Sequence, residues 1–203
     1  MTNTKLAMPL DTQSPQDPQQ QSQVNKSQYS FPYKILHWAM ALVMIALLIA
    51  GQQFNFNISD EYRHHGLIFH SSVGTLALIA AFSLLIKRFL LKHHRPESGL
   101  PYLQTLSANL VQFALYALAI AIPVTGLLAA YYSPHEVMLF GSYKISLASG
   151  ETEQAWTTIR WLHRWATRLT MLLLACHAGA ALYHHFIVKD DVLRKMIIKP
   201  FRR

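Results

Sequence analysis

Long apolar runs alternate with short polar connections along most of the chain. Four runs, at about residues 31–54, 66–91, 106–132 and 159–188, contain few charged side chains. A helix needs about 20 mostly apolar residues to cross the hydrocarbon core of a bilayer, and each run reaches that length. The pattern predicts an all-α integral membrane protein, built as a bundle of four transmembrane helices.

The first 30 residues have a different composition. They are rich in Gln, Pro, Ser and Asn and show almost no aliphatic periodicity. Such a segment buries too little apolar surface to offset the entropy lost on ordering. We therefore expect a disordered polar tail over residues 1–30 and one membrane domain over residues 31–203. No cleavable signal peptide is evident.

Composition narrows the class of protein further. Of the 203 residues, 52% are hydrophobic and 14% are charged, which is typical of membrane proteins. A net charge of +8 is also found in proteins that bind nucleic acid. Here, however, the basic residues cluster beside the apolar runs. We therefore expect membrane lipid and no nucleic acid as partner. The single cysteine, Cys176, excludes an internal disulfide and a cysteine-based zinc or iron–sulfur site.

The connections between the runs predict the orientation in the membrane. The second connection carries Lys87, Arg88, Lys92 and Arg95, and six basic residues follow residue 188. The other two connections have few basic residues. Because positive charge concentrates on the cytoplasmic side, both termini and the second connection are expected in the cytoplasm, which fits a multi-pass protein with an even number of spans.

Four histidines lie within or at the edges of these runs. His37 and His70 stand near the starts of the first and second runs, and His163 and His177 both belong to the fourth. An imidazole inside a membrane is a hypothesis of function by default. The 14 residues between His163 and His177 return to nearly the same helix face while rising roughly 21 Å. One helix thus offers imidazoles at two depths.

The predicted orientation sorts these histidines into pairs. His70 and His163 fall on the outer side, whereas His37 and His177 fall on the inner side. Facing imidazoles from two helices are suitable axial ligands for haem iron in a bundle core. Each histidine alone is more often an interfacial polar residue. Zinc is the competing metal, but it usually takes three or four ligands at one site.

Other polar and special residues have simpler interpretations. Pro123 and Gly126 in the third run predict a bend that makes room for a bulky cofactor. Five further histidines are expected in loops, solvated or interfacial: His64, His65, His93, His94 and His135. Three arginines at the outer side attract anionic groups or extend to the interface: Arg63, Arg160 and Arg164.

Taken together, these motifs resemble the bacterial cytochrome b561 family, which comprises small four-helix membrane cytochromes b. The similarity covers about residues 29–198. The segments that carry it are Tyr33–Trp38, His70–Gly74, Ala121–Gly126, Leu162–His163, His177–Phe186 and Lys189–Asp190.

The resemblance implies two non-covalently bound haems b with His37, His70, His163 and His177 as axial ligands to the iron. It also implies electron exchange with the quinone pool. Similar members oxidise superoxide at the outer face and reduce ubiquinone, the function we favour. Others serve as cytochrome b anchors that pass electrons between quinone and a partner redox enzyme. A haem-free membrane carrier would leave the paired histidines unexplained.

His184 is the candidate for quinone chemistry. It lies about 10 Å along the helix beyond His177, too far to share that iron. Quinone reduction consumes protons as well as electrons, and a histidine near the cytoplasmic surface can deliver them. The alternative is an interfacial His184–His185 pair that hydrogen-bonds to lipid headgroups.

Overall fold

The computed structural model describes residues 29–90, 101–147 and 152–197. The tail expected over residues 1–30 therefore lies, up to residue 28, outside the described residues. So do His93 and His94 of the second connection, and no side chain is described for residues 87–90.

Four long helices make up the described chain, and all four are long and apolar enough to cross a membrane. This confirms the predicted all-α membrane bundle. The helices are α2 (Phe31–Gln52), α3 (Asp60–Leu90), α4 (Tyr102–Tyr131) and α5 (Glu153–Tyr183). A single 3₁₀ turn, η1 (Gln53–Asn55), follows α2, and a π turn, η3 (His184–Val188), continues α5.

Helix α3 begins six residues before the predicted start at Gly66. Asp60 and Glu61 occupy its first turn, where carboxylates stabilise the positive end of the helix dipole. The Ser59 hydroxyl accepts a hydrogen bond from the Tyr62 N–H, at 3.3 Å, as a capping residue does. Polar residues thus extend the helix beyond its apolar part.

Two expectations about loops change as a result. His64 and His65 lie on α3 and not in a loop, although both are exposed as predicted. Arg63 also belongs to this first part of α3. His135, in contrast, lies in the connection after α4 and is exposed.

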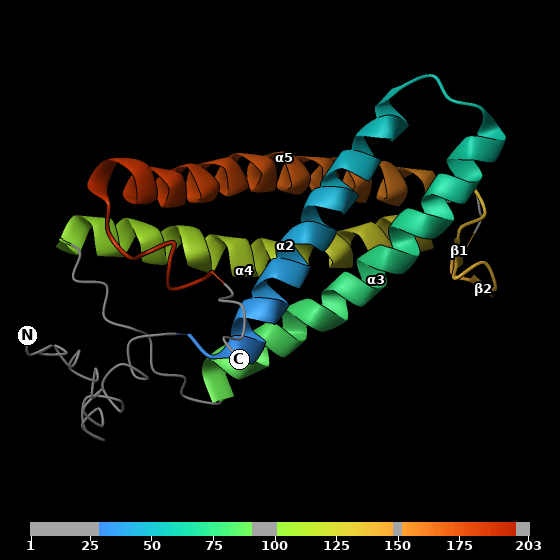
Figure 1. Cartoon of the computed structure of the whole chain (residues 1–203). Helices are drawn as coiled ribbons and strands as arrows, with labels where there is room; N and C mark the ends of the chain where they lie inside the picture. Colours follow the sequence, from blue (N-terminus) through green and yellow to red (C-terminus); the bar gives the residue numbers. More distant parts are fainter. Residues whose placement is uncertain (1–28, 91–100, 148–151, 198–203) are drawn as a thin grey trace, which may run out of the picture.

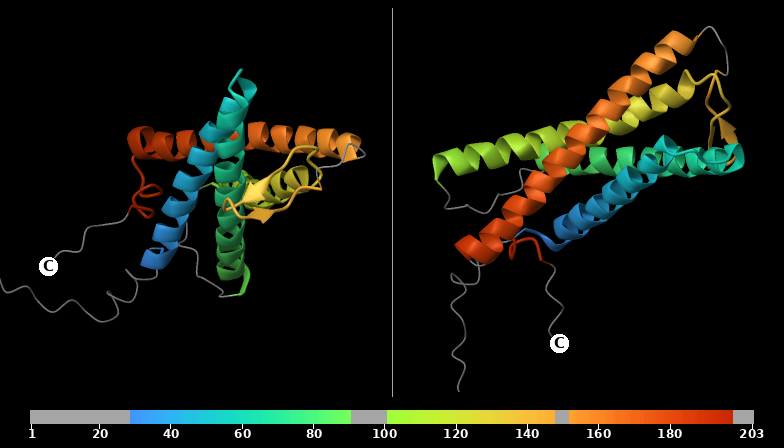
Figure 2. Two further views of the ribbon diagram at one scale, coloured as in Figure 1. Left: turned by 90° about the vertical axis from the view of Figure 1, so that its right-hand side faces the viewer. Right: turned by 90° about the horizontal axis from the view of Figure 1, so that it is seen from above.

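Consecutive helices pack as neighbours: α2 with α3, α3 with α4, and α4 with α5. The α2–α3 pair crosses the α4–α5 pair, as Figure 1 and the two further views in Figure 2 show. Large apolar side chains face outward along the helices, among them Leu42 at 67% and Ile49 at 69% exposure. A surface this apolar would promote aggregation in water, but it is stable in contact with lipid.

A small hairpin closes the connection between α4 and α5. Strands β1 (Met138–Leu139) and β2 (Tyr143–Lys144) pair antiparallel, next to a turn in which Phe140 and Gly141 adopt positive φ. The Phe140 N–H donates to the buried Ser72 hydroxyl of α3 at 2.7 Å. The connection between α4 and α5 therefore contains a hairpin attached to α3.

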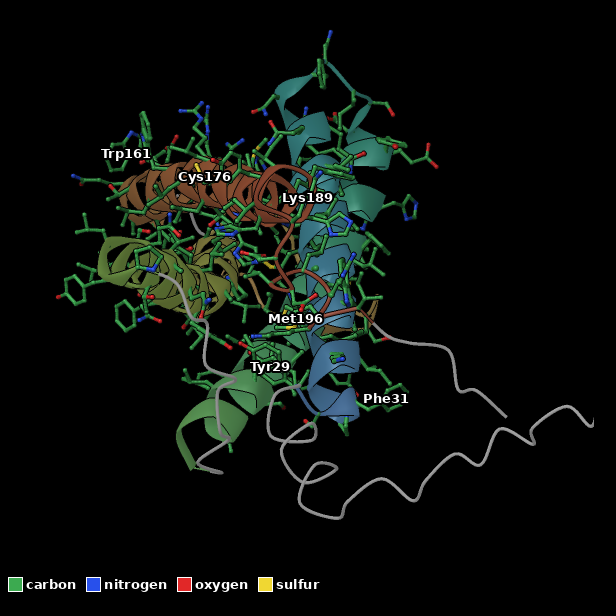
Figure 3. The ribbon with its side chains drawn as sticks, turned by 60° about the vertical axis from the view of Figure 1, so that its left-hand side comes forward. Tyr29, Phe31, Trp161, Cys176, Lys189 and Met196 are labelled. Atoms are coloured by element: carbon green, nitrogen blue, oxygen red, sulfur yellow. The ribbon has the colours of Figure 1, made fainter. Side chains whose placement is uncertain are left out.

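Residues 189–197, which we call the C-terminal strap, return from the end of α5 to the start of α2. Lys189 adopts a left-handed conformation, with φ of 60°, where the π turn ends. The Trp38 indole N–H donates to the Met196 carbonyl at 3.0 Å, and the buried Lys34 ammonium donates to the Ile197 carbonyl at 3.2 Å. Figure 3 shows Met196 near the first turns of α2.

Candidate functional site

The inner histidines come from the two ends of the described chain. His37 lies in the second turn of α2, and His177 lies near the end of α5. Their ring centroids are 6.3 Å apart with planes inclined at 73°. His37 also stacks on Trp38, at 5.6 Å between centroids. Both imidazoles are partly buried.

The outer histidines form a second pair with nearly the same geometry. His70 of α3 and His163 of α5 have ring centroids 6.4 Å apart and planes inclined at 85°. Phe54, after the end of α2, packs its ring edge against His70 at 5.9 Å. Since α5 is one continuous helix, 14 residues separate the two pairs by roughly 21 Å of rise.

The separation within each pair fits a shared metal ion. A bond from histidine nitrogen to zinc is about 2.0–2.1 Å, so two imidazoles on opposite sides of one ion of similar size have centroids about 6 Å apart. Within the described ranges, no three His, Cys, Asp or Glu side chains gather as a metal cluster. Each level therefore offers two imidazoles.

Small residues leave space for the outer rings. A Cβ added to Gly126 of α4 would lie 3.1 Å from His163 Cε1, which is tighter than an ordinary contact. A Cβ added to Gly51 of α2 would lie 3.5 Å from His70 Cε1. The buried Nδ1 of His70 has no hydrogen-bond partner in the described part of the chain. The glycines make room for the two rings, and the orphaned nitrogen fits a bound group at this level.

Helix α4 was expected to bend at Pro123. The helix runs continuously through this buried proline, and the bend itself stays a prediction. The bulky group that Gly126 accommodates is the His163 ring itself. Sequence reasoning connected Gly126 with a cofactor and missed this direct contact, because nothing in the spacing places α4 against one residue of α5.

His184 has a partner that sequence reasoning missed. Its Nδ1 lies 2.5 Å from Asp190 Oδ2, across the π turn, with side-chain exposures of 14% and 26%. Partial burial opposes ionisation of Asp190, but the Val192 N–H and His184 outweigh it, so the pKa of Asp190 lies below its ordinary value. The signal in the sequence was a histidine six residues before an aspartate at the end of a helix.

Three cations gather near the starts of α3 and α5: Arg63, Arg160 and Arg164. The positive charges of Arg164 and Arg63 both act on the Arg160 guanidinium. Cations from α3 and α5 therefore contribute to the same local electrostatic field. Arg160 also lies over the Trp156 ring, 5.0 Å from its centroid. Trp161 and Trp165 lie beside each other on an exposed face of α5, consistent with packing against lipid.

The chain is similar to known proteins over most of its length. Residues 28–199 match the family described as prokaryotic cytochrome b561. Cytochrome b561 homolog 2 of Escherichia coli K12 is 25% identical over 164 residues, covering 80% of this chain and 87% of the relative. Cytochrome b561 homolog 1 of the same organism is 26% identical over 168 residues, covering 80% and 92%.

A third relative is the probable superoxide oxidase CybB of Yersinia pestis. It is 25% identical over 171 residues, which cover 81% of this chain and 92% of the relative. The family match spans most of the chain, including all four helices and both histidine pairs. The chain belongs to the prokaryotic cytochrome b561 family of membrane electron-transfer proteins, which bind haem b.

Proposed function

We propose that this protein transfers electrons across the bacterial inner membrane between two haems b and the quinone pool, as a superoxide:ubiquinone oxidoreductase. The observation that carries the proposal is the presence of two histidine pairs, 6.3 Å and 6.4 Å between ring centroids, at two levels of one bundle. Two levels are what a chain that moves electrons from one membrane face to the other requires.

The assignment of ligands follows from the pairs. His37 with His177 would hold the iron of the inner haem, and His70 with His163 that of the outer haem. Haem supplies one-electron redox chemistry, while the protein sets the ligands, the polarity around them and access of solvent. The partly buried rings and the surrounding apolar helices supply that environment.

Charge at the outer face supports an anionic electron donor. Arg63, Arg160 and Arg164 create a positive field beside the outer pair, and such a field raises the local concentration of small anions. Superoxide is a small anion that loses one electron to become dioxygen. Two superoxide ions, one ubiquinone and two protons give two dioxygen molecules and one ubiquinol.

The inner face needs a source for those two protons. The Asp190 carboxylate can only accept, so the hydrogen of His184 lies on Nδ1 and Nε2 is left to exchange a proton. With both termini in the cytoplasm, as the basic connections indicate, His184 lies on the cytoplasmic side. We assign it the transfer of protons from water to quinone.

The test of the function is reduction of the purified protein by superoxide, followed through the haem absorbance. We expect superoxide to reduce the haem, and added ubiquinone to restore the oxidised spectrum with formation of ubiquinol. Failure of superoxide to reduce haem that dithionite reduces would contradict this function and favour a cytochrome anchor that receives electrons from a partner enzyme.

A further inference from the structure

The outer ligand candidate on α5 is held by the main chain of α4. His163 Nδ1 lies 3.0 Å from the Ile122 carbonyl oxygen and 3.2 Å from Thr125 Oγ1. The carbonyl can only accept, so Nδ1 carries the hydrogen and donates it. Nε2 is then the nitrogen with a free lone pair, as ligation of iron requires.

Thr125 is itself fixed in its helix. Its hydroxyl lies 2.7 Å from the Ala121 carbonyl and 2.9 Å from the Ile122 carbonyl, and donates its one hydrogen to this main chain. The oxygen therefore keeps a lone pair for the His163 N–H. Two acceptors on one turn of α4 share that hydrogen.

Gly126 completes the cradle around the ring. An added Cβ there would meet His163 Cε1 at 3.1 Å and His163 Nδ1 at 3.4 Å, so the ring would have to move. Glycine at this position lets the imidazole approach α4 closely enough to reach the Ile122 carbonyl. The same turn thus supplies both the space and the acceptors.

The partner ring is held differently. The buried Nδ1 of His70 meets no acceptor in the described part of the chain, and the ring instead contacts Phe54. Of the two outer histidines, His163 is therefore the one through which hydrogen bonding can change the properties of the outer haem. Nothing in the sequence distinguished the two histidines in this respect.

We propose that Thr125 and Gly126 are positioning residues which set the reduction potential and affinity of the outer haem through His163. The inference rests on the proposed ligation by His163. An acceptor on Nδ1–H makes the imidazole a more basic ligand, which favours ferric over ferrous iron. Removing one of two acceptors therefore raises the potential of the outer haem.

Potentiometric titration of the purified full-length protein tests this. Thr125→Val keeps the size of the side chain and removes the hydroxyl. We expect the ratio of ferric to ferrous affinity at one haem to fall by up to about tenfold, which raises its potential by up to about 59 mV. Thr125→Ser, which restores the hydroxyl, should return the potential to that of the wild type.

Haem content and the electron paramagnetic resonance spectrum provide the second arm. Gly126→Ala should displace His163, change the low-spin ferric signal of one haem and reduce its occupancy. Gly179→Ala is the matched control, since an added Cβ there meets nothing within 4 Å and Gly179 is exposed on α5. The control should retain both signals.

The outcomes separate the two proposals. No haem at all in the wild-type protein would overturn the proposed function. Two haems with potentials that Thr125→Val leaves unchanged would overturn only the positioning role. A shift of both potentials by the same amount would also overturn it, because that is a general effect on the bundle. A shift of the one component that His163→Ala removes supports it.

Discussion

At the scale of single residues, Asp190 determines what His184 can do. It fixes the hydrogen on Nδ1 and points the remaining nitrogen away from the pair. The turn that brings the two together ends at Lys189, where the chain takes positive φ and the Asp190 N–H bonds to the His184 carbonyl at 3.2 Å. Sequence reasoning singled out His184 but did not pair it with Asp190, because spacing in a regular helix does not place residues six apart on one face.

The pair makes a prediction about quinone chemistry. Asp190→Asn and His184→Phe should both slow quinone-dependent reoxidation, by about 10²-fold or more if proton transfer is lost. Haem content and haem reduction by superoxide should stay unchanged. Rapid-mixing absorbance measurements follow both steps.

His185→Phe is the matched control, since the His185 ring contacts Phe186 at 4.8 Å and lies next to His184. It should reoxidise at the wild-type rate. If His184→Phe itself reoxidised at the wild-type rate, His184 would be only an interfacial residue and the proposed proton transfer would be wrong.

The lowered pKa of Asp190 also makes a prediction about stability. A carboxyl group whose pKa is lower in the folded state contributes stability above its unfolded pKa, about 3.9, and loses it as pH falls through the folded value. Asp190→Asn should therefore be less stable than the wild type at pH 7, and the difference should vanish at strongly acidic pH. Thermal unfolding in detergent at several pH values measures this, and a difference that grows as pH falls would contradict it.

At the scale of the elements, α5 carries one member of each histidine pair. Because a helix repeats every 3.6 residues, the 14-residue spacing in the sequence predicts that His163 and His177 share a face. Which partner each would meet depended on the orientation of α2 and α3, which the basic connections supplied. Other details had no such signal. The apolar pattern shows only which residues face lipid. It therefore did not predict that α3 starts at Asp60 or that the hairpin binds Ser72.

The two pairs should be separable by mutation. His70→Ala or His163→Ala should remove one spectral and potentiometric component, and His37→Ala or His177→Ala the other. The reason is that each pair lies at its own level, with one ring from α5 in both. Visible spectra during redox titration give the measurement, with expression level recorded beside haem content because an empty cavity destabilises the bundle.

One result would show that the pairing is wrong. If His70→Ala and His177→Ala removed the same component and spared the other, residues from different levels would act together. Gly179→Ala again serves as a control that should lose neither component.

At the scale of the whole molecule, four helices with outward-facing apolar side chains enclose two levels of imidazoles. The C-terminal strap crosses to α2 at the inner end, through Lys34 and Trp38, and the hairpin lies at the outer end on α3. Each end of the bundle therefore has its own covering segment. The hydropathy pattern predicted the position of neither segment, because both positions depend on hydrogen bonds between residues far apart in the sequence.

The central claim is that one chain binds two haems b through these four histidines. The most direct measurement is the amount of haem per chain, by pyridine haemochrome assay of the purified protein from haem-replete cells. We predict about two haems b per chain, both removed by acid acetone because no haem-attaching cysteine motif is present in the sequence. A value near zero, or one haem per chain under saturating haem, would contradict the account.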